Sequence, residues 1–280
     1  MAKRLFCEIS PLTYKISVNM NIFKRKIKWM ANSNSYASTH FDEKLPYMLY
    51  QSKSIIRRKL GNVDMSLQEN KAVNLGIAAP KLNGILIKPN QVFSFWKLVG
   101  NCVASKGYLE GLVIKNSDVG VGIGGGMCQL TNLIHWLILH SPLTVLEHHH
   151  HNQFDLFPDF GRTVPFGTGT SIMFNYLDYQ FVNNTAYTFQ LIIYTTDEHL
   201  GGELRCDSPN GQSYHIVERN AYFSQVEDTY FRYNEVYQIT IDKTTGDTVD
   251  EKLINQNRSK VLYDASLIPA DLILSNNSIC

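Results

Sequence analysis

A run of glycines ends where an apolar segment begins, and this junction sets the strongest limit on how the chain can fold. Gly120, Gly122 and the triplet 124–126 are followed at once by MCQLTNLIHWLILHSPL. We expect a helix of about fourteen residues here, stopped by Ser141 and Pro142 and too short to span a bilayer. The glycines therefore place Cys128 in the first turn of an apolar helix.

The same glycines satisfy the GxGxxG pattern that is typical of dinucleotide-binding folds. A helix follows, and Glu147 lies about twenty residues beyond the run, where such folds carry an acidic residue. Two observations are against a dinucleotide site. The strand predicted before the run ends near Ile114, six residues too early for the tight turn, and the chain after Pro142 shows no helices alternating with strands. We therefore expect no nucleotide and no other cofactor.

The pattern along the chain predicts three regions. Residues 1–60 form a basic, helical N-terminal arm, residues 61–200 form a mixed domain around the glycine run, and residues 201–280 form a β-rich C-terminal extension. Strands are predicted at 85–87, 92–95 and 111–114, with period-two alternation from 187 to 193, and a hairpin at VYQITID-KTTGD-TVDEKLI. The fold class we expect is α+β: a mixed core carrying the glycine-run and cysteine helix, the basic helical arm and a β-rich C-terminal region.

Charge is balanced overall but uneven along the chain. Lys and Arg total 26 against 25 Asp and Glu, so no nucleic-acid partner is expected. Seven basic residues precede residue 30 against the single acid Glu8, namely Lys3, Arg4, Lys15, Lys24, Arg25, Lys26 and Lys28. Between Leu12 and Trp29 the lysines and apolar residues fit a helix that lies in solvent, on anionic lipid or on an acidic surface of the protein itself. We see no signal segment or membrane span, which predicts a cytoplasmic protein that can contact the membrane peripherally.

The five cysteines are widely spaced and form no CxxC pair, so we expect reduced thiols rather than a zinc cage or a disulfide framework. At a helix start, unsatisfied N–H groups and the helix dipole favour the thiolate of Cys128 over the thiol. Gly124, Gly125 and Gly126 would let a substrate approach the sulfur and leave N–H groups for a developing oxyanion, with Gln129 as a side-chain donor. Cys128 is thus a candidate nucleophile, and a buried structural cysteine is the alternative.

A cysteine nucleophile needs a base, and four consecutive histidines follow about twenty residues downstream on a predicted strand. Alternation along a strand sends two of them to each face. Either His149 and His151 or His148 and His150 therefore face Cys128.

Two carboxylates could orient that imidazole, Glu147 and Asp178, and the sequence does not choose between them. A metal site and a plain surface tract are alternative interpretations of the histidines. Residues that alternate on a strand rarely converge on one ion without a third ligand, so we expect no metal. His135 lies two helical turns from Cys128, too far for a direct hydrogen bond, and is interpreted as a core or surface histidine.

Three stretches, NQVFSFWKLVG, GIGGGMCQLTNLIHWLILHSPLTVLEHHHHN and DYQFVNNT, resemble the VanW family in their order and spacing, over about residues 69–195. The resemblance is closest to the short type found in glycopeptide-resistance clusters, which lacks an export signal. It places the family's cysteine on Cys128, its glutamine on Gln129, its hydroxyl on Thr131 and its two histidines on His149 and His151.

The chain also departs from the pattern of that family. His148 stands where an arginine is usual, Asn152 where a serine is usual, and Gly169 where an aspartate is common. Gly169 has no side chain, so it cannot take over any role of that aspartate. Asp178, in contrast, matches the family.

The resemblance implies an accessory protein of glycopeptide (vancomycin) resistance. Domains of this family on exported proteins look like thiol-dependent transpeptidases that act on peptidoglycan stem peptides. By that likeness Cys128 attacks a donor-peptide carbonyl and His151 carries the proton, while the glycine amides, Thr131 and Glu147 hold the substrate. The alternative is a non-catalytic binding module for a cell-wall peptide or precursor.

Overall fold

The computed structural model describes residues 5–32, 35–58, 64–115, 118–150, 154–156, 158–159 and 164–274. Within these residues the chain is an α+β protein, as predicted. The α-helices are α1 (Pro11–Ala31), α2 (Met65–Ala78), α3 (Phe95–Val99) and α4 (Met127–Leu139). Short 3-10 helices lie at Phe6–Glu8, Ala79–Lys81, Ala104–Lys106, Ala265–Leu267 and Ala270–Leu272. None of the described helices has the length and apolar character needed to cross a bilayer.

A four-stranded antiparallel sheet forms the centre of the main core. Its order is β1 (Tyr47–Ile55), β10 (His199–Cys206), β9 (Phe189–Thr195) and β2 (Ile85–Ile87). Helix α4 packs on it, with Ile134 and Leu137 fully buried in the same cluster as Leu204 of β10. Gly202 permits the close approach, because a Cβ there would lie 3.0 Å from Leu137 Cδ1. The apolar helix predicted after the glycines is thus a buried helix of the core.

Two smaller sheets contain the strands that precede and follow α4 in the chain. One contains β3 (Val92–Ser94), β8 (Gln180–Val182) and β6 (Thr144–Glu147), and the other is the hairpin of β4 (Glu110–Lys115) and β5 (Asp118–Ile123). The strand predicted at 111–114 is confirmed as β4, but a second strand that was not predicted, β5, follows it and contains Gly120 and Gly122. Strand β5 leads through the turn at 124–126 into α4. Because β4 and β5 are antiparallel, the glycine pattern lacks the parallel βαβ context of a dinucleotide site.

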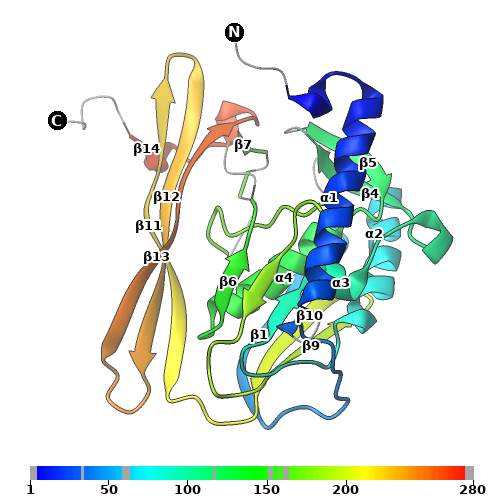
Figure 1. Ribbon diagram of the computed structural model, residues 1–280. Coiled ribbons are helices and arrows are strands. Elements are labelled where there is room, and N and C mark those ends of the chain that lie inside the picture. The colour runs from blue at the N-terminus through cyan, green and yellow to red at the C-terminus, as the bar shows by residue number, and fades with distance from the viewer. Residues whose placement is uncertain are drawn as a thin grey trace.

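The C-terminal region forms a five-stranded sheet built around three long strands (Figure 1). Its order is β14 (Ile273–Leu274), β11 (Gln212–Val226), β12 (Thr229–Asp242), β13 (Thr248–Val261) and β7 (Phe154–Asp155). The predicted hairpin is confirmed: β12 and β13 pair antiparallel, and Asp242 Oδ1 accepts hydrogen bonds from the amides of Thr244 and Thr245 in the turn. In Figure 1 this sheet lies to the left of the core, and α1 runs along the front of the core.

The predicted helical arm of residues 1–60 is right for α1 and wrong for Tyr47–Ile55, which is strand β1. Exposure along β1 alternates from Gln51 to Ile55, which is typical of a strand at the surface of a sheet. The edge of β10 supplies its backbone hydrogen bonds, and this pairing outweighs the local helical tendency. The domain boundaries at residues 60 and 200 stay a prediction.

Candidate functional site

Cys128 is the second residue of α4, after Met127, and Gly126 caps the helix with φ +100°. Its side chain is half-buried. Burial raises the pKa of the thiol above its ordinary value, and a hydrogen bond from the backbone N–H of Ile172 offsets this only in part. The group expected to be a thiolate is therefore a thiol at rest near neutral pH, because the loss of hydration outweighs the helix dipole.

The glycine turn is built for close backbone packing. A Cβ on Gly125 would lie 2.2 Å from the carbonyl carbon of Gly111 in β4, so only glycine fits there. The amides of Gly124 and Gly125 donate to the carbonyl oxygens of Leu109 and Gly122. These two amides are engaged, so a developing oxyanion would have to be met by the amides at the start of α4.

A loop at 168–172 lies against the first turn of α4. Asn132 Oδ1 accepts hydrogen bonds from the amide and the hydroxyl of Thr170, at 2.6 and 2.8 Å. The hydroxyls of Thr131 and Thr170 also share a hydrogen bond. Thr131 is fully buried, and its hydroxyl oxygen lies 3.2 Å from the carbonyl oxygen of Cys128. The hydroxyl that the family resemblance assigns to substrate binding therefore fastens this loop to the helix.

Two adjacent amides of the same loop connect the cysteine with the histidine segment. The N–H of Ser171 donates to the carbonyl oxygen of His149, and the N–H of Ile172 points to the sulfur of Cys128. Consecutive Cα atoms are about 3.8 Å apart, so the two segments lie in one small region of the molecule.

Glu147, at the end of β6, connects α1 with the histidine segment. Its carboxylate accepts two hydrogen bonds from Arg25 of α1, at 2.6 and 2.7 Å, and one from the amide of Asp178 at 2.9 Å. His149 Nε2 lies 3.2 Å from the same carboxylate. Burial acts to raise the pKa of Glu147, but its donors, led by Arg25, hold it below the ordinary value. Of the two carboxylates that the sequence left open, Glu147 is the one that contacts a described histidine of the tract.

Asp178 is buried and has a different role. Its carboxylate accepts hydrogen bonds from Ser94 Oγ (2.6 Å), the Trp96 amide (3.0 Å), the Tyr179 amide (2.9 Å) and Gln180 Nε2 (2.8 Å). Burial raises its pKa, while these hydrogen bonds act in the opposite direction. In the part of the chain that the structure describes it contacts no histidine, and its hydrogen bonds hold the start of α3 against β8.

The described histidines of the tract divide between two sides. His148 stacks on His135 of α4, with ring centroids 4.2 Å apart, and on His150, with centroids 5.4 Å apart. His149 turns instead to Glu147, so these residues alternate as expected even though they follow the end of β6. Burial lowers the pKa of His148 to about 4, so its ring is neutral near pH 7.

His135 is a core residue, exposed over 2% of its surface. Its Nδ1 lies 3.0 Å from the hydroxyl oxygen of Tyr179, and burial lowers the pKa of its ring well below the ordinary value. The sequence interpretation missed this contact, and Arg25 with it, because no spacing along the chain relates residues on separate elements.

Comparison with known proteins identifies the family. The family described as VanW like protein matches residues 70–205. The vancomycin B-type resistance protein VanW of Enterococcus faecalis is 32% identical over 228 residues, which cover 81% of this chain and 82% of that protein. The chain belongs to the VanW family. The uncharacterized protein YoaR of Bacillus subtilis is 24% identical over 121 residues, 42% of this chain and 37% of that protein, and no solved structure matches.

Two departures from the VanW pattern lie face to face in the structure. His148 Nε2 donates a hydrogen bond of 2.9 Å to the carbonyl oxygen of Gly169. One hydrogen bond from a neutral ring therefore joins the two positions where the sequence departs from the VanW resemblance. The space beside Gly169 is open, because a Cβ there would come no closer than 3.9 Å to Asn132 Oδ1.

Further residues of the predicted VanW site have other positions. Gln129 Nε2 donates to Ser54 Oγ and to the carbonyl oxygen of Ile55, at 2.9 Å each, and so anchors the end of β1 on α4. His151 and Asn152 lie outside the described residues. Within the described ranges, no group of three or more His, Cys, Asp or Glu side chains is placed to hold a metal ion.

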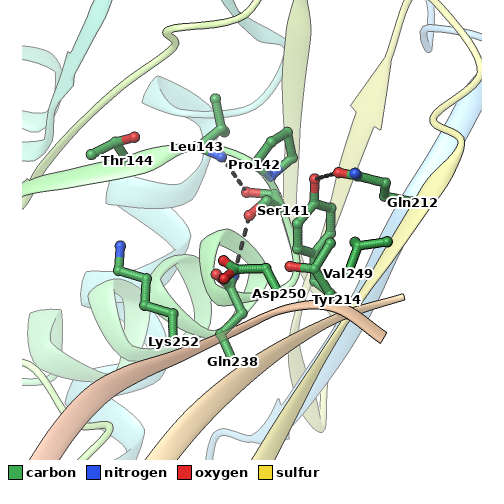
Figure 2. A pocket seen from close by; sticks show the side chains of 11 residues that line it. Ser141, Pro142, Leu143, Thr144, Gln212, Tyr214, Gln238, Val249, Asp250 and Lys252 are labelled. Carbon is green, nitrogen blue, oxygen red and sulfur yellow. Dashed lines mark hydrogen bonds between the residues drawn. The ribbon is translucent and has the colours of Figure 1, made fainter. Parts of the chain in front are cut away.

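An open hollow of about 390 Å³ lies at the other end of α4 from Cys128 (Figure 2). It is lined by Ser141, Pro142, Leu143, Thr144, Gln212, Tyr214, Gln238, Thr240, Val249, Asp250 and Lys252. Gln238 Nε2 donates to the carbonyl oxygens of Leu139 and Ser141, which fastens β12 to the end of the helix. The residues that carry the VanW resemblance at Cys128 and at the histidines do not line this hollow.

Proposed function

We propose that this protein is an accessory glycopeptide-resistance protein that transfers an acyl group of a peptidoglycan stem peptide through Cys128. The relative whose name states a resistance role aligns with most of the chain. The observation that carries the proposal is the pair of adjacent amides, of Ser171 and Ile172, that hold the His149 segment and the Cys128 sulfur together.

The mechanism starts from a protonated thiol, so a base has to take the proton as the sulfur attacks. We assign this role to His149, whose Nε2 lies 3.2 Å from the carboxylate of Glu147. The sulfur of Cys128 bonds to the carbonyl carbon of the donor peptide, the C–N bond breaks, and the leaving amine takes the proton from the imidazole. An acceptor amine then attacks the thioester and gives its proton to the imidazole, which returns it to the departing sulfur.

A binding module for a cell-wall peptide or precursor is the second candidate. Two observations favour it: burial raises the pKa of the Cys128 thiol, and the amides of Gly124 and Gly125 already donate to backbone carbonyls. In that case the site would hold a peptide without forming a covalent bond to it.

Intact-mass spectrometry of the full chain with a synthetic stem tetrapeptide separates the two candidates. We expect a thioester adduct in the wild type and in a Cys7→Ala control, and none in Cys128→Ala. Cys128→Ser should stay folded, at a cost of about 1 kcal/mol, and lose the transfer, because a hydroxyl is a far weaker acid than a thiol.

Calorimetry with the same peptide measures binding that occurs without an adduct. A folded Cys128→Ala protein that binds the peptide as the wild type does, with no adduct in either protein and with full resistance in cells, would establish the binding module and overturn the catalytic proposal.

A further inference from the structure

Helix α1 presents two different faces, of which one contacts the rest of the protein. On the inner face Arg25 donates to Glu147, and Trp29 packs against the main core. On the outer face six large apolar residues, here called the α1 stripe, are exposed over 47% to 75% of their surface: Leu12 67%, Ile16 47%, Met20 47%, Phe23 63%, Ile27 49% and Met30 75%. A helix on the surface of a soluble protein normally turns such a stripe toward the core.

The helical repeat sets the two faces apart. The residues of the α1 stripe recur every three or four positions, which places them on one side of the helix. Arg25 follows Phe23 by two positions and Trp29 follows Ile27 by two, which is about 200° around the axis. The stripe therefore points away from the body of the protein, and Figure 1 shows α1 running along the front of the core.

Lysines border the α1 stripe on both sides. Lys24 and Lys28 each follow a stripe residue by one position, and Lys15 and Lys26 each precede one. At about 100° per residue these side chains lie along the two margins of the stripe. All of them are exposed, and α1 contains no acidic residue.

We propose that α1 docks the protein on an anionic lipid surface. An apolar stripe bordered by lysines suits a helix that lies in the plane of the interface, with its apolar side chains at the boundary of headgroups and acyl chains and its ammonium groups among the phosphates. The exposed side chains of Leu5, Phe6 and Ile9 extend the apolar surface ahead of the helix. Charge complementarity favours lipid over a second copy, because another α1 offers no carboxylate to the lysines.

Docking would also place the candidate site beside the membrane. The stripe and Arg25 lie on opposite faces of the same helix, and Arg25 is bonded to Glu147, which in turn contacts His149. This proposal goes beyond the proposed function and does not depend on the chemistry at Cys128.

Cosedimentation of the full chain with lipid vesicles tests the proposal. The protein should bind vesicles of phosphatidylcholine mixed with phosphatidylglycerol at low ionic strength, bind phosphatidylcholine alone weakly, and dissociate as salt is added. Phe23→Ser should weaken binding to the mixed vesicles about tenfold. Lys24→Gln and Lys28→Gln should each weaken it about fivefold and flatten its salt dependence.

Leu253→Ser is the matched control, because Leu253 is a leucine of β13 exposed over 47% of its surface on the C-terminal sheet. It should bind as the wild type does, and all variants should show wild-type circular dichroism. Equal binding of the wild type to neutral and anionic vesicles, no binding at low salt, or full binding by Phe23→Ser would each overturn the proposal. So would a concentration-dependent dimer in analytical ultracentrifugation that Phe23→Ser dissociates, with no vesicle binding, since the stripe would then join two copies.

Discussion

At the scale of single residues, the partner of a half-buried group decides its protonation. Cys128 sits at a helix start, yet burial raises the pKa of its thiol, because the amide of Ile172 is a neutral donor. Glu147 is also half-buried, yet its pKa is lowered, because Arg25 donates two charge-assisted hydrogen bonds. The motif places the cysteine at the helix start, and its surroundings determine whether it is a thiol or a thiolate.

Alkylation of Cys128 by iodoacetamide should therefore be slow at neutral pH. The thiolate is the reacting form, so the rate should rise with pH around a midpoint above the value of about 8.5 for a free cysteine. Peptide mass spectrometry at a series of pH values measures the rate at Cys128 separately from the other cysteines. A midpoint clearly below that value would show that the helix dipole prevails over burial.

At the scale of elements, one ion pair joins α1 to the end of β6 across 122 positions of the chain. The side chains of Arg25 and Glu147 are exposed over only 13% and 19% of their surface. Water cannot readily replace either partner, so loss of one leaves the other charge poorly solvated. The ion pair between Arg219 and Glu251 on the C-terminal sheet is exposed over 43% and 36%, and water can replace its partners.

Arg25→Gln should lower the free energy of unfolding by about 2 kcal/mol, less than the loss of a fully buried partner. Arg219→Gln is the matched control and should change it by about 0.5 kcal/mol or less. Urea denaturation followed by circular dichroism measures both. If the two substitutions had equal effects, the pair between α1 and β6 would be no stronger than a surface pair.

At the scale of the whole molecule, buried neutral histidines make stability depend on pH. Burial lowers the pKa of His140 and of His148 to about 4, from 6.5, and lowers that of His135 well below 6.5. His140 also stacks on Tyr50 of β1, with centroids 3.6 Å apart, so these rings tie α4 and the segments after it to their neighbours. The unfolded chain binds protons that the folded protein excludes between pH 6.5 and about 4.

Stability should therefore be full above pH 6.5 and fall as the pH decreases toward 4. The lowered pKa of Glu147 adds to this loss at the acid end, while the raised pKa of Asp178 opposes it. Urea midpoints at pH 7 and pH 5 measure the effect. His140→Gln should reduce the difference between the two midpoints, and the exposed His40→Gln control should leave it unchanged; a difference that His140→Gln preserves would contradict the assignment.

Elements whose signals are local can be predicted from the amino-acid sequence. The glycine turn followed by an apolar run predicts α4, and the turn residues between two alternating runs predict the hairpin of β12 and β13. The period-two alternation from 187 to 193 likewise indicates β9. Each of these patterns involves residues that are close together in the sequence. Over such short distances the backbone geometry of a helix or a strand fixes the direction of each side chain from its position.

Contacts between groups that are distant in the chain follow from the tertiary structure. It made Tyr47–Ile55 a strand, because β10 offers that segment an edge, and it chose Glu147 over Asp178 as the carboxylate beside His149. It also raised the pKa of the Cys128 thiol where a helix start alone would lower it. The physical reason is the same in each case: strand pairing and the loss of hydration depend on atoms brought together from remote parts of the chain, and no spacing within a motif records which atoms those are.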